Sequence, residues 1–158
     1  MIIKAIETEW FQDYKVPSMF IAFPKCSFKC ERDCGVCCCQ NSTLAKIDDI
    51  HITLDEIVRQ YKRNPITKAI VCGGLDPMDS FYDLLGLINY IRNSGILDDV
   101  VIYTGYTEDE VHREVEVLRE CKNIVVKFGR FIPNGKKRYD EVLGVTLASD
   151  NQYAKRIS

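Results

Sequence analysis

The sequence predicts an α/β fold in which a mostly parallel sheet is flanked by helices. Apolar runs of strand length alternate along the chain with segments whose apolar residues recur at helical spacing. Two helical segments begin with a capping box, and turns rich in Gly or Pro follow the strand-like runs. This alternation is typical of βαβ units, whose buried strands read as continuous apolar runs.

The first expected strand covers residues 18–23 and ends at Pro24, just before a cysteine-rich loop at about 25–45. A capping box formed by Thr53 and Glu56 then opens a helix. The remaining elements follow in turn: a strand at 68–72, a helix at 80–93, a strand at 99–103, a helix from the capping box at 107–110 to about 120, and a strand at 123–128.

The composition is that of one globular domain, residues 1–158. Hydrophobic residues make up 46% of the chain and charged residues 28%, which excludes a disordered chain. The formal charge of −2 provides no basic excess, so no direct binding to nucleic acid is expected. No apolar run reaches the roughly 18 residues of a membrane span, and the first residues lack the layout of an export signal, so a cytoplasmic location is expected.

Six of the eight cysteines lie within fourteen residues, which indicates a metal site in a reducing compartment. A zinc ion needs four ligands, and the pairs Cys26-x3-Cys30 and Cys34-x2-Cys37 have the spacing of such a site. An iron–sulfur cluster needs converging thiolates, and three of them leave one iron open to a small molecule. The spacing of the cysteines alone does not distinguish a zinc site from an iron–sulfur cluster.

The residues that follow the expected strands favour a ligand-binding site. The cysteine loop, the segment 73–77, the turn 104–106 and the segment 129–131 each come directly after a strand. Because ligands bind at the carboxyl ends of strands in parallel α/β sheets, we expect all four segments to line one mouth. A structural zinc module has no need of such a cleft.

These segments resemble motifs of the radical S-adenosylmethionine (SAM) family and, within it, of the activating proteins of anaerobic (class III) ribonucleoside-triphosphate reductases. The matching stretches occur in the family's order and span nearly the whole chain: Cys26-Ser27-Phe28-Lys29-Cys30 with Cys39-Gln40-Asn41, Gly73-Gly74-Leu75-Asp76-Pro77, Tyr103-Thr104-Gly105-Tyr106, and Gly129-Arg130-Phe131 with the tail at 144–152. The resemblance implies an incomplete (β/α) barrel of the radical SAM type, since eight βα units take about 250 residues.

Two departures from the family pattern concern the cluster loop and the glycine motif. The family's usual Cys-x3-Cys-x2-Cys is not present from Cys26, and Cys39 is preferred as the third ligand because Gln40-Asn41 follows it, as in the family. The frame Cys30-x3-Cys34-x2-Cys37 fits the spacing without an insertion, and Cys38 is a further alternative. In the glycine motif, Leu75 separates the glycine pair from Asp76.

By this resemblance, Cys26, Cys30 and Cys39 hold a [4Fe–4S] cluster, while Gly73, Gly74, Asp76, Pro77, Thr104 and Asn41 bind SAM. The family cleaves SAM reductively, giving methionine and a 5′-deoxyadenosyl radical that takes a hydrogen atom from a glycine of the partner. The implied partners are the large subunit of anaerobic ribonucleotide reductase and a reducing electron donor. No side chain is expected as a general acid or base, because the cofactors supply the chemistry.

Three other functions remain open from the sequence, one of which is a degenerate family member that binds a cluster but does not cleave SAM. The same chemistry in an activase for another glycyl radical enzyme would differ only in its partner. A noncatalytic zinc-binding interaction module is consistent with the Cys34-x2-Cys37 pair.

Overall fold

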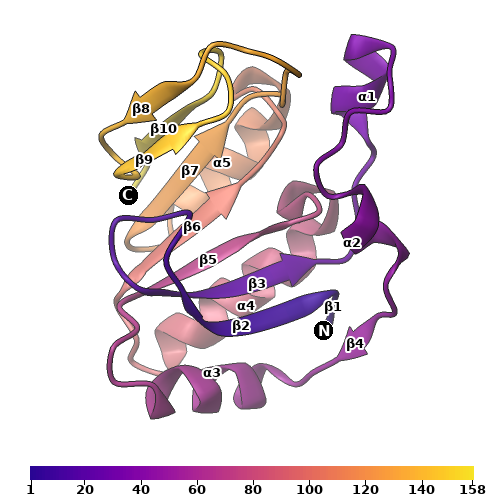
Figure 1. Ribbon diagram of the computed structural model, residues 1–158. Helices are drawn as coiled ribbons and strands as arrows, with labels where there is room; N and C mark the ends of the chain where they lie inside the picture. Colours follow the sequence, from indigo (N-terminus) through magenta and orange to yellow (C-terminus); the bar gives the residue numbers. More distant parts are fainter.

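The computed structural model describes all 158 residues and contains one central six-stranded sheet (Figure 1). The strand order is β10-β7-β6-β5-β3-β2. The four inner strands are parallel, and both edge strands are antiparallel to their neighbours. The strands are β2 (Ala5–Trp10), β3 (Ser18–Phe23), β5 (Ala69–Gly74), β6 (Asp99–Tyr103), β7 (Ile124–Phe128) and β10 (Tyr153–Arg156).

Three helices cover one face of this sheet: α3 (Leu54–Arg63), α4 (Phe81–Asn93) and α5 (His112–Arg119) (Figure 1). Their apolar residues pack against alternate residues of the inner strands in the main core. Two 3-10 helices, η1 (Pro77–Ser80) and η2 (Asp109–Val111), lead directly into α4 and α5. This face therefore supplies most of the buried apolar surface that stabilises the fold.

The opposite face of the sheet carries a smaller apolar core, and the helices α3, α4 and α5 do not cover it. Ala69, Val71, Val101 and Val125 point to this side, where they pack with Tyr14, Leu143, Leu147 and Ala154. The cover comes from the loop between β2 and β3 and from the hairpin of β8 (Arg138–Asp140) and β9 (Val145–Leu147). Part of this face therefore remains available for a pocket.

The cysteine-rich segment forms two short helices, α1 (Lys29–Cys34) and α2 (Ser42–Lys46), beyond the end of β3. A two-residue strand, β4 (Ile50–His51), then pairs with β1 (Ile2–Ile3) at the start of the chain. These elements place the cysteines at the carboxyl edge of the parallel strands.

The local predictions hold for the inner strands and for α3 to α5, while the barrel is not confirmed. Thr53 caps α3 by accepting a hydrogen bond from the Glu56 amide, as expected. At the second capping box Glu110 accepts bonds from the amide and hydroxyl of Thr107, and the segment begins as η2. The sheet is open, with β2 and β10 as its edge strands. No helix of the structure has the length and apolarity needed to cross a bilayer.

Candidate metal centre

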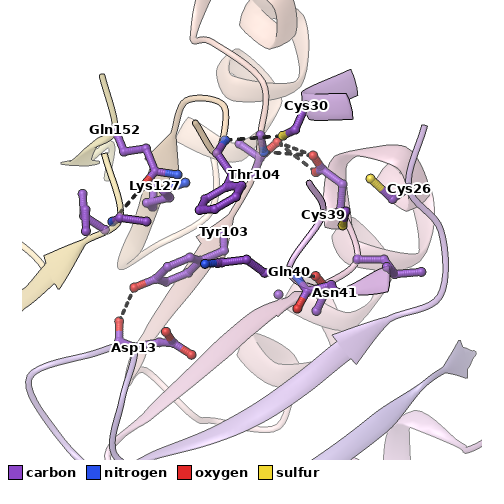
Figure 2. Close-up of a pocket in the computed structure, with 18 of the residues that line it drawn as sticks. Asp13, Cys26, Cys30, Cys39, Gln40, Asn41, Tyr103, Thr104, Lys127 and Gln152 are labelled. Atoms are coloured by element: carbon purple, nitrogen blue, oxygen red, sulfur yellow. Dashed lines mark hydrogen bonds between the residues drawn. The ribbon is translucent and has the colours of Figure 1, made fainter. Parts of the chain in front are cut away.

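A pocket of about 500 Å³ lies at the carboxyl ends of the parallel strands (Figure 2). All four segments that the sequence places after the strands contribute to its lining, together with β9 and the loop after β2. A volume of this size is in the range of small-molecule sites, roughly 300–1,000 Å³. The parallel strands therefore converge on a cavity large enough for a ligand.

Three of the clustered cysteines, Cys26, Cys30 and Cys39, line this pocket (Figure 2). Cys26 Sγ accepts a hydrogen bond from the Phe28 amide at 3.2 Å, and Cys30 Sγ accepts one from the Phe131 amide at 3.4 Å. Backbone N–H groups aimed at the sulfurs stabilise thiolates, because they donate to the charged form. The backbone thus prepares two of these cysteines to act as metal ligands.

Burial raises the pKa of the Cys26 thiol, whereas the Phe28 amide and the Lys29 ammonium lower it by smaller amounts. Burial also raises the pKa of the Cys39 thiol, against a lowering contribution from the Asn41 amide. Metal binding replaces the proton of a thiol, so a cation in the pocket would hold these groups as thiolates.

The other three cysteines of the segment do not line the pocket. Cys34 and Cys37 are exposed, and Cys34 Sγ lies 2.9 Å from Cys38 Sγ. Sharing a proton with Cys34 raises the pKa of Cys38 to about 12. The structure therefore separates the sequence candidates into an inner set facing the cavity and an outer set on the surface.

The number of lining thiols, three, is the number that holds a four-iron cluster with one open iron. Around one zinc, sulfurs at a Zn–S distance of about 2.3 Å lie about 3.8 Å apart. No three His, Cys, Asp or Glu side chains are gathered closely enough to hold one metal ion. In a cluster each thiolate binds a different iron, so its sulfurs stand farther apart. Cys26, Cys30 and Cys39 line one cavity and are the candidates for these ligands.

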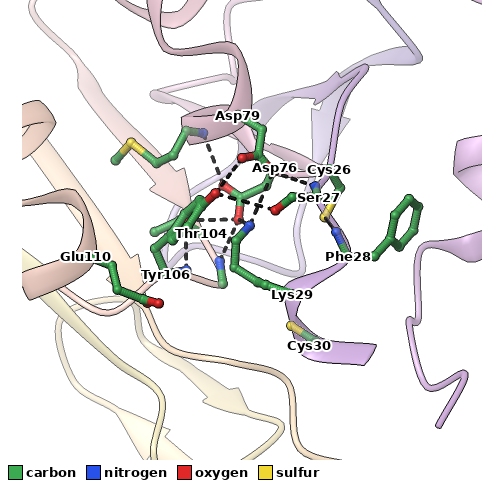
Figure 3. A network of polar contacts seen from close by, with 12 residues as sticks. Cys26, Ser27, Phe28, Lys29, Cys30, Asp76, Asp79, Thr104, Tyr106 and Glu110 are labelled. Carbon is green, nitrogen blue, oxygen red and sulfur yellow. Dashed lines mark hydrogen bonds and ion pairs between the residues drawn. The ribbon is translucent and has the colours of Figure 1, made fainter. Parts of the chain in front are cut away.

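A buried ion pair joins the cysteine segment to the end of β5 (Figure 3). Lys29, between two of the lining cysteines, is 2% exposed. Its Nζ lies 3.0 Å from Asp76 Oδ2 and 3.2 Å from Asp79 Oδ2, and 3.5 Å from the centre of the Tyr106 ring. Although burial alone favours the neutral amine, these carboxylates raise the pKa of Lys29. The ammonium is therefore a fixed positive charge beside the thiols.

Asp76 connects this ion pair to the end of β6. Its carboxylate accepts hydrogen bonds from Thr104 Oγ1 at 2.8 Å, the Gly105 amide at 2.9 Å and the Met78 amide at 3.1 Å. Asp76 and Thr104 are 5% and 3% exposed and both line the pocket. One carboxylate thus fixes three segments of the pocket wall relative to one another.

Asp79 anchors the same network from η1. It accepts bonds from the Ser27 amide at 2.7 Å and from Tyr106 Oη at 2.6 Å. Burial raises the pKa of Asp79, but the bonds from Tyr106, Ser27 and Lys29 outweigh burial and leave it below the ordinary value. Asp79 therefore remains ionised and holds the turn between β3 and α1.

Gly73, Gly74 and Asn41 line the pocket, whereas Pro77 does not. Gly74 has φ +78°, and a Cβ there would lie 2.7 Å from the Cβ of Ala22 on β3. Only glycine fits this position, because the backbone is left-handed and the neighbouring strand is too close. Asn41 Nδ2 donates to the Gly74 carbonyl, which ties the cysteine segment to β5. Pro77 is buried at the first position of η1.

Arg130 fastens the helix that carries Cys30 to the opposite wall. Its Nε lies 2.6 Å from Asp33 Oδ2 of α1, and its Nη2 lies 2.6 Å from Glu110 Oε1. The bond to Arg130 lowers the pKa of Glu110 to about 2. The segment after β7 thereby holds Cys30 from outside while its Phe131 amide contacts the sulfur.

Several site residues were missed from the sequence: Lys29, Asp79, Tyr106, Asp13 and Lys127. Asp13 lines the pocket and accepts a hydrogen bond from Trp10 Nε1 at 2.6 Å, and burial raises its pKa. Lys127 interrupts the apolar run of β7 and points to the face without helices. A charge inside a buried strand was the signal that could have identified it.

Comparison with protein families matches residues 18–153 to the 4Fe-4S single cluster domain. No curated protein and no solved structure matches the chain significantly. The match covers most of the chain, including the cysteine segment and all of the pocket lining except Trp10, Gln12 and Asp13. This finding favours an iron–sulfur cluster over the zinc alternative. The chain therefore belongs to the 4Fe-4S single cluster domain family and is an iron–sulfur, radical SAM-like protein.

Proposed function

We propose that the protein is a radical SAM activase that cleaves S-adenosylmethionine reductively and generates a glycyl radical on anaerobic ribonucleotide reductase. The observation that carries this proposal is the single pocket into which Cys26, Cys30 and Cys39 face together with the glycine segment after β5. A cluster held by three thiolates has an iron free for a ligand, and the adjoining cavity provides the space for that ligand.

In this proposal the three pocket cysteines are the cluster ligands, and the outer cysteines are not. Cys26 and Cys30 receive backbone N–H bonds at their sulfurs, which stabilises their ligating form. Asn41 holds the segment after Cys39 against Gly74. Thr104 Oγ1 donates a hydrogen bond to the Asp76 carboxylate, which fixes the pocket wall at the ends of β5 and β6.

Cys26, Cys30 and Cys39 would hold the cluster, which when bound and reduced would supply the electron for reductive cleavage of SAM. This chain's task is to orient the ligand and to keep water from the reacting atoms. On the pocket side, loops and the short β8–β9 hairpin cover the sheet, and no layer of helices lies over them. A face of this kind provides a route by which a cytoplasmic partner's glycine loop reaches the ligand.

The test is anaerobic reconstitution with iron and sulfide, followed by iron analysis, EPR of the reduced protein with and without SAM, and detection of 5′-deoxyadenosine. We expect about four irons per chain and a signal that changes when SAM is added. A glycyl radical signal should then appear on class III reductase only when SAM is present. Cluster formation without cleavage of SAM would refute the activase.

Single Cys→Ala variants identify the ligands. Cys26→Ala, Cys30→Ala and Cys39→Ala should each lose most of the bound iron and all 5′-deoxyadenosine formation. Cys34→Ala and Cys37→Ala are the matched controls from the same segment, and both should retain the cluster. Loss of the cluster in these two controls, with retention in Cys26→Ala and Cys39→Ala, would establish the frame Cys30/Cys34/Cys37 instead.

A further inference from the structure

Cys34 and Cys38 hold their sulfurs 2.9 Å apart on the outside of the cysteine segment. Cys34 is exposed and Cys38 is half-buried, and neither lines the pocket that Cys26, Cys30 and Cys39 share. The helix α1, which ends at Cys34, stands at the margin of the molecule (Figure 1). A reagent in solution therefore reaches Cys34 without entering the pocket.

The end of α1 brings these two sulfurs together. Gly35 follows Cys34 in the left-handed conformation, with φ +70°, and its amide donates to the Glu31 carbonyl at 2.9 Å. This cap stops the helix and turns the chain back, so that Cys38 returns to Cys34. The Cys39 amide then donates to the Glu31 carboxylate at 3.0 Å. Two hydrogen bonds to Glu31 therefore keep the ends of this turn together.

The pair has the geometry of a dithiol and not of a second metal site. Two cysteines are bridged without backbone movement only when they are close, and an S–S bond needs these sulfurs to approach from 2.9 Å to about 2.05 Å. A zinc ion would need further donors, and no three His, Cys, Asp or Glu side chains are gathered closely enough to hold one metal ion. Cys37, which is also exposed, takes no part in the contact between Cys34 and Cys38.

We propose that Cys34 and Cys38 form a reversible disulfide, a redox-responsive modification site apart from the cluster ligands. With a small disulfide such as oxidised glutathione as the oxidant, the Cys34 thiolate attacks one of its sulfurs and expels one glutathione. The Cys38 sulfur then attacks Cys34 Sγ, which forms the Cys34–Cys38 bond and expels the second glutathione. Two electrons pass from the cysteines to the S–S bond of the oxidant, and the two protons of the cysteine thiols are balanced by those of the two glutathione thiols.

Oxidation at this site fixes the chain between Cys30 and Cys39 and leaves both of them as thiolates for the cluster. Exposed disulfides are the labile ones, which form and break as the thiol–disulfide balance of the compartment changes. The inference is independent of the reaction that the cluster supports, because it rests on the outer pair of cysteines alone.

The experiment oxidises the reconstituted full chain anaerobically with glutathione disulfide and locates the bond by differential labelling. Free thiols are blocked with one maleimide under denaturing, acidic conditions, and the disulfide is then reduced and labelled with a second maleimide of different mass. Trypsin gives one peptide, residues 33–46, that contains the three outer cysteines and Cys39. We expect the second label on Cys34 and Cys38 and the first label on the other two, with two glutathiones released per chain and no loss of iron.

Cys37→Ser is the matched control from the same loop and should form the same disulfide. Cys34→Ser should form no disulfide within the peptide and should stop at one glutathione adduct on Cys38. Second label on Cys37, or on no cysteine of the wild type, would overturn the site. Second label on Cys39 together with loss of iron would also overturn it, because the oxidised thiols would then be cluster ligands.

A chain that takes up no iron would contradict the proposed function without deciding the disulfide. The same labelling is therefore repeated on the cluster-free full chain, where Cys34 and Cys38 should again carry the second label. Absence of that label from both forms of the protein would overturn the disulfide and leave the proposed function standing.

Discussion

Replacement of Lys29 by Met tests whether the buried ion pair holds the cysteine segment in place. The substitution keeps the length of the side chain and removes charge-assisted bonds to Asp76 and Asp79. Removing one member of a buried pair costs about 3–5 kcal/mol. The lower end applies, because Asp76 keeps bonds from Thr104 and two amides, and Asp79 keeps bonds from Tyr106 and an amide. We therefore expect a loss of about 3 kcal/mol.

The assay is denaturant unfolding of the cluster-free full chain under reducing conditions, so that metal binding does not contribute. A loss of that size corresponds to a fall in Tm of roughly 6–12 °C for a domain of this length. Lys68→Met is the control, since Lys68 is exposed and its substitution should change stability by less than about 0.5 kcal/mol. If Lys29→Met lowered the free energy of unfolding no more than Lys68→Met did, the ion pair would not be what holds the cysteine segment against β5.

Three further predictions concern stability. Gly74→Ala should lower the free energy of unfolding by about 2–4 kcal/mol in denaturant unfolding, because its φ is +78° and the added Cβ would lie 2.7 Å from that of Ala22. The control Gly86→Ala adds a Cβ in open space on α4 and should raise the free energy of unfolding by up to about 1 kcal/mol. Thr53→Ala should cost about 1 kcal/mol through loss of the α3 cap, measured in the same way. Lys127 loses its proton near pH 8 when folded and near 10.5 when unfolded, so the unfolded state binds more protons between these values and stability rises with pH. Between pH 8 and 10.5 the free energy of unfolding of the wild type should rise by roughly 3 kcal/mol relative to that of Lys127→Met. If the free energies of unfolding of the two proteins changed in parallel with pH, the lowered pKa would be contradicted.

The inner strands and the covering helices were predictable because their signals are local. Apolar runs mark β3, β5, β6 and β7, and a Thr–Glu pair marks the start of α3. The edge strands β2 and β10 were not predicted. In β2, Ile6, Thr8 and Trp10 alternate with Glu7 and Glu9, which is a strand signal that was missed, whereas β10 is four residues long and shows no such alternation. β2 pairs with β3, the next strand along the chain, whereas β10 pairs with β7 across the long connection of residues 129–152.

The candidate site was predictable to the extent that it consists of motifs. Cys26, Cys30 and Cys39 could be proposed from the resemblance to the radical SAM family, and all three line the pocket. Lys29 could not, because its environment is made by Asp76 and Asp79, about fifty residues away. The sequence shows that a lysine stands between two cysteines, but tertiary structure alone brings the carboxylates to it.

The position of Asp76 physically links the cysteine segment to the wall of the pocket. Its carboxylate holds Lys29 of the cysteine segment and Thr104 of the ligand pocket at the same time. A ligand that favours one arrangement of this carboxylate changes the affinity for the cluster, and the cluster changes the affinity for the ligand by the same factor. A cluster and a ligand that both act on this carboxylate would therefore change each other's affinity equally.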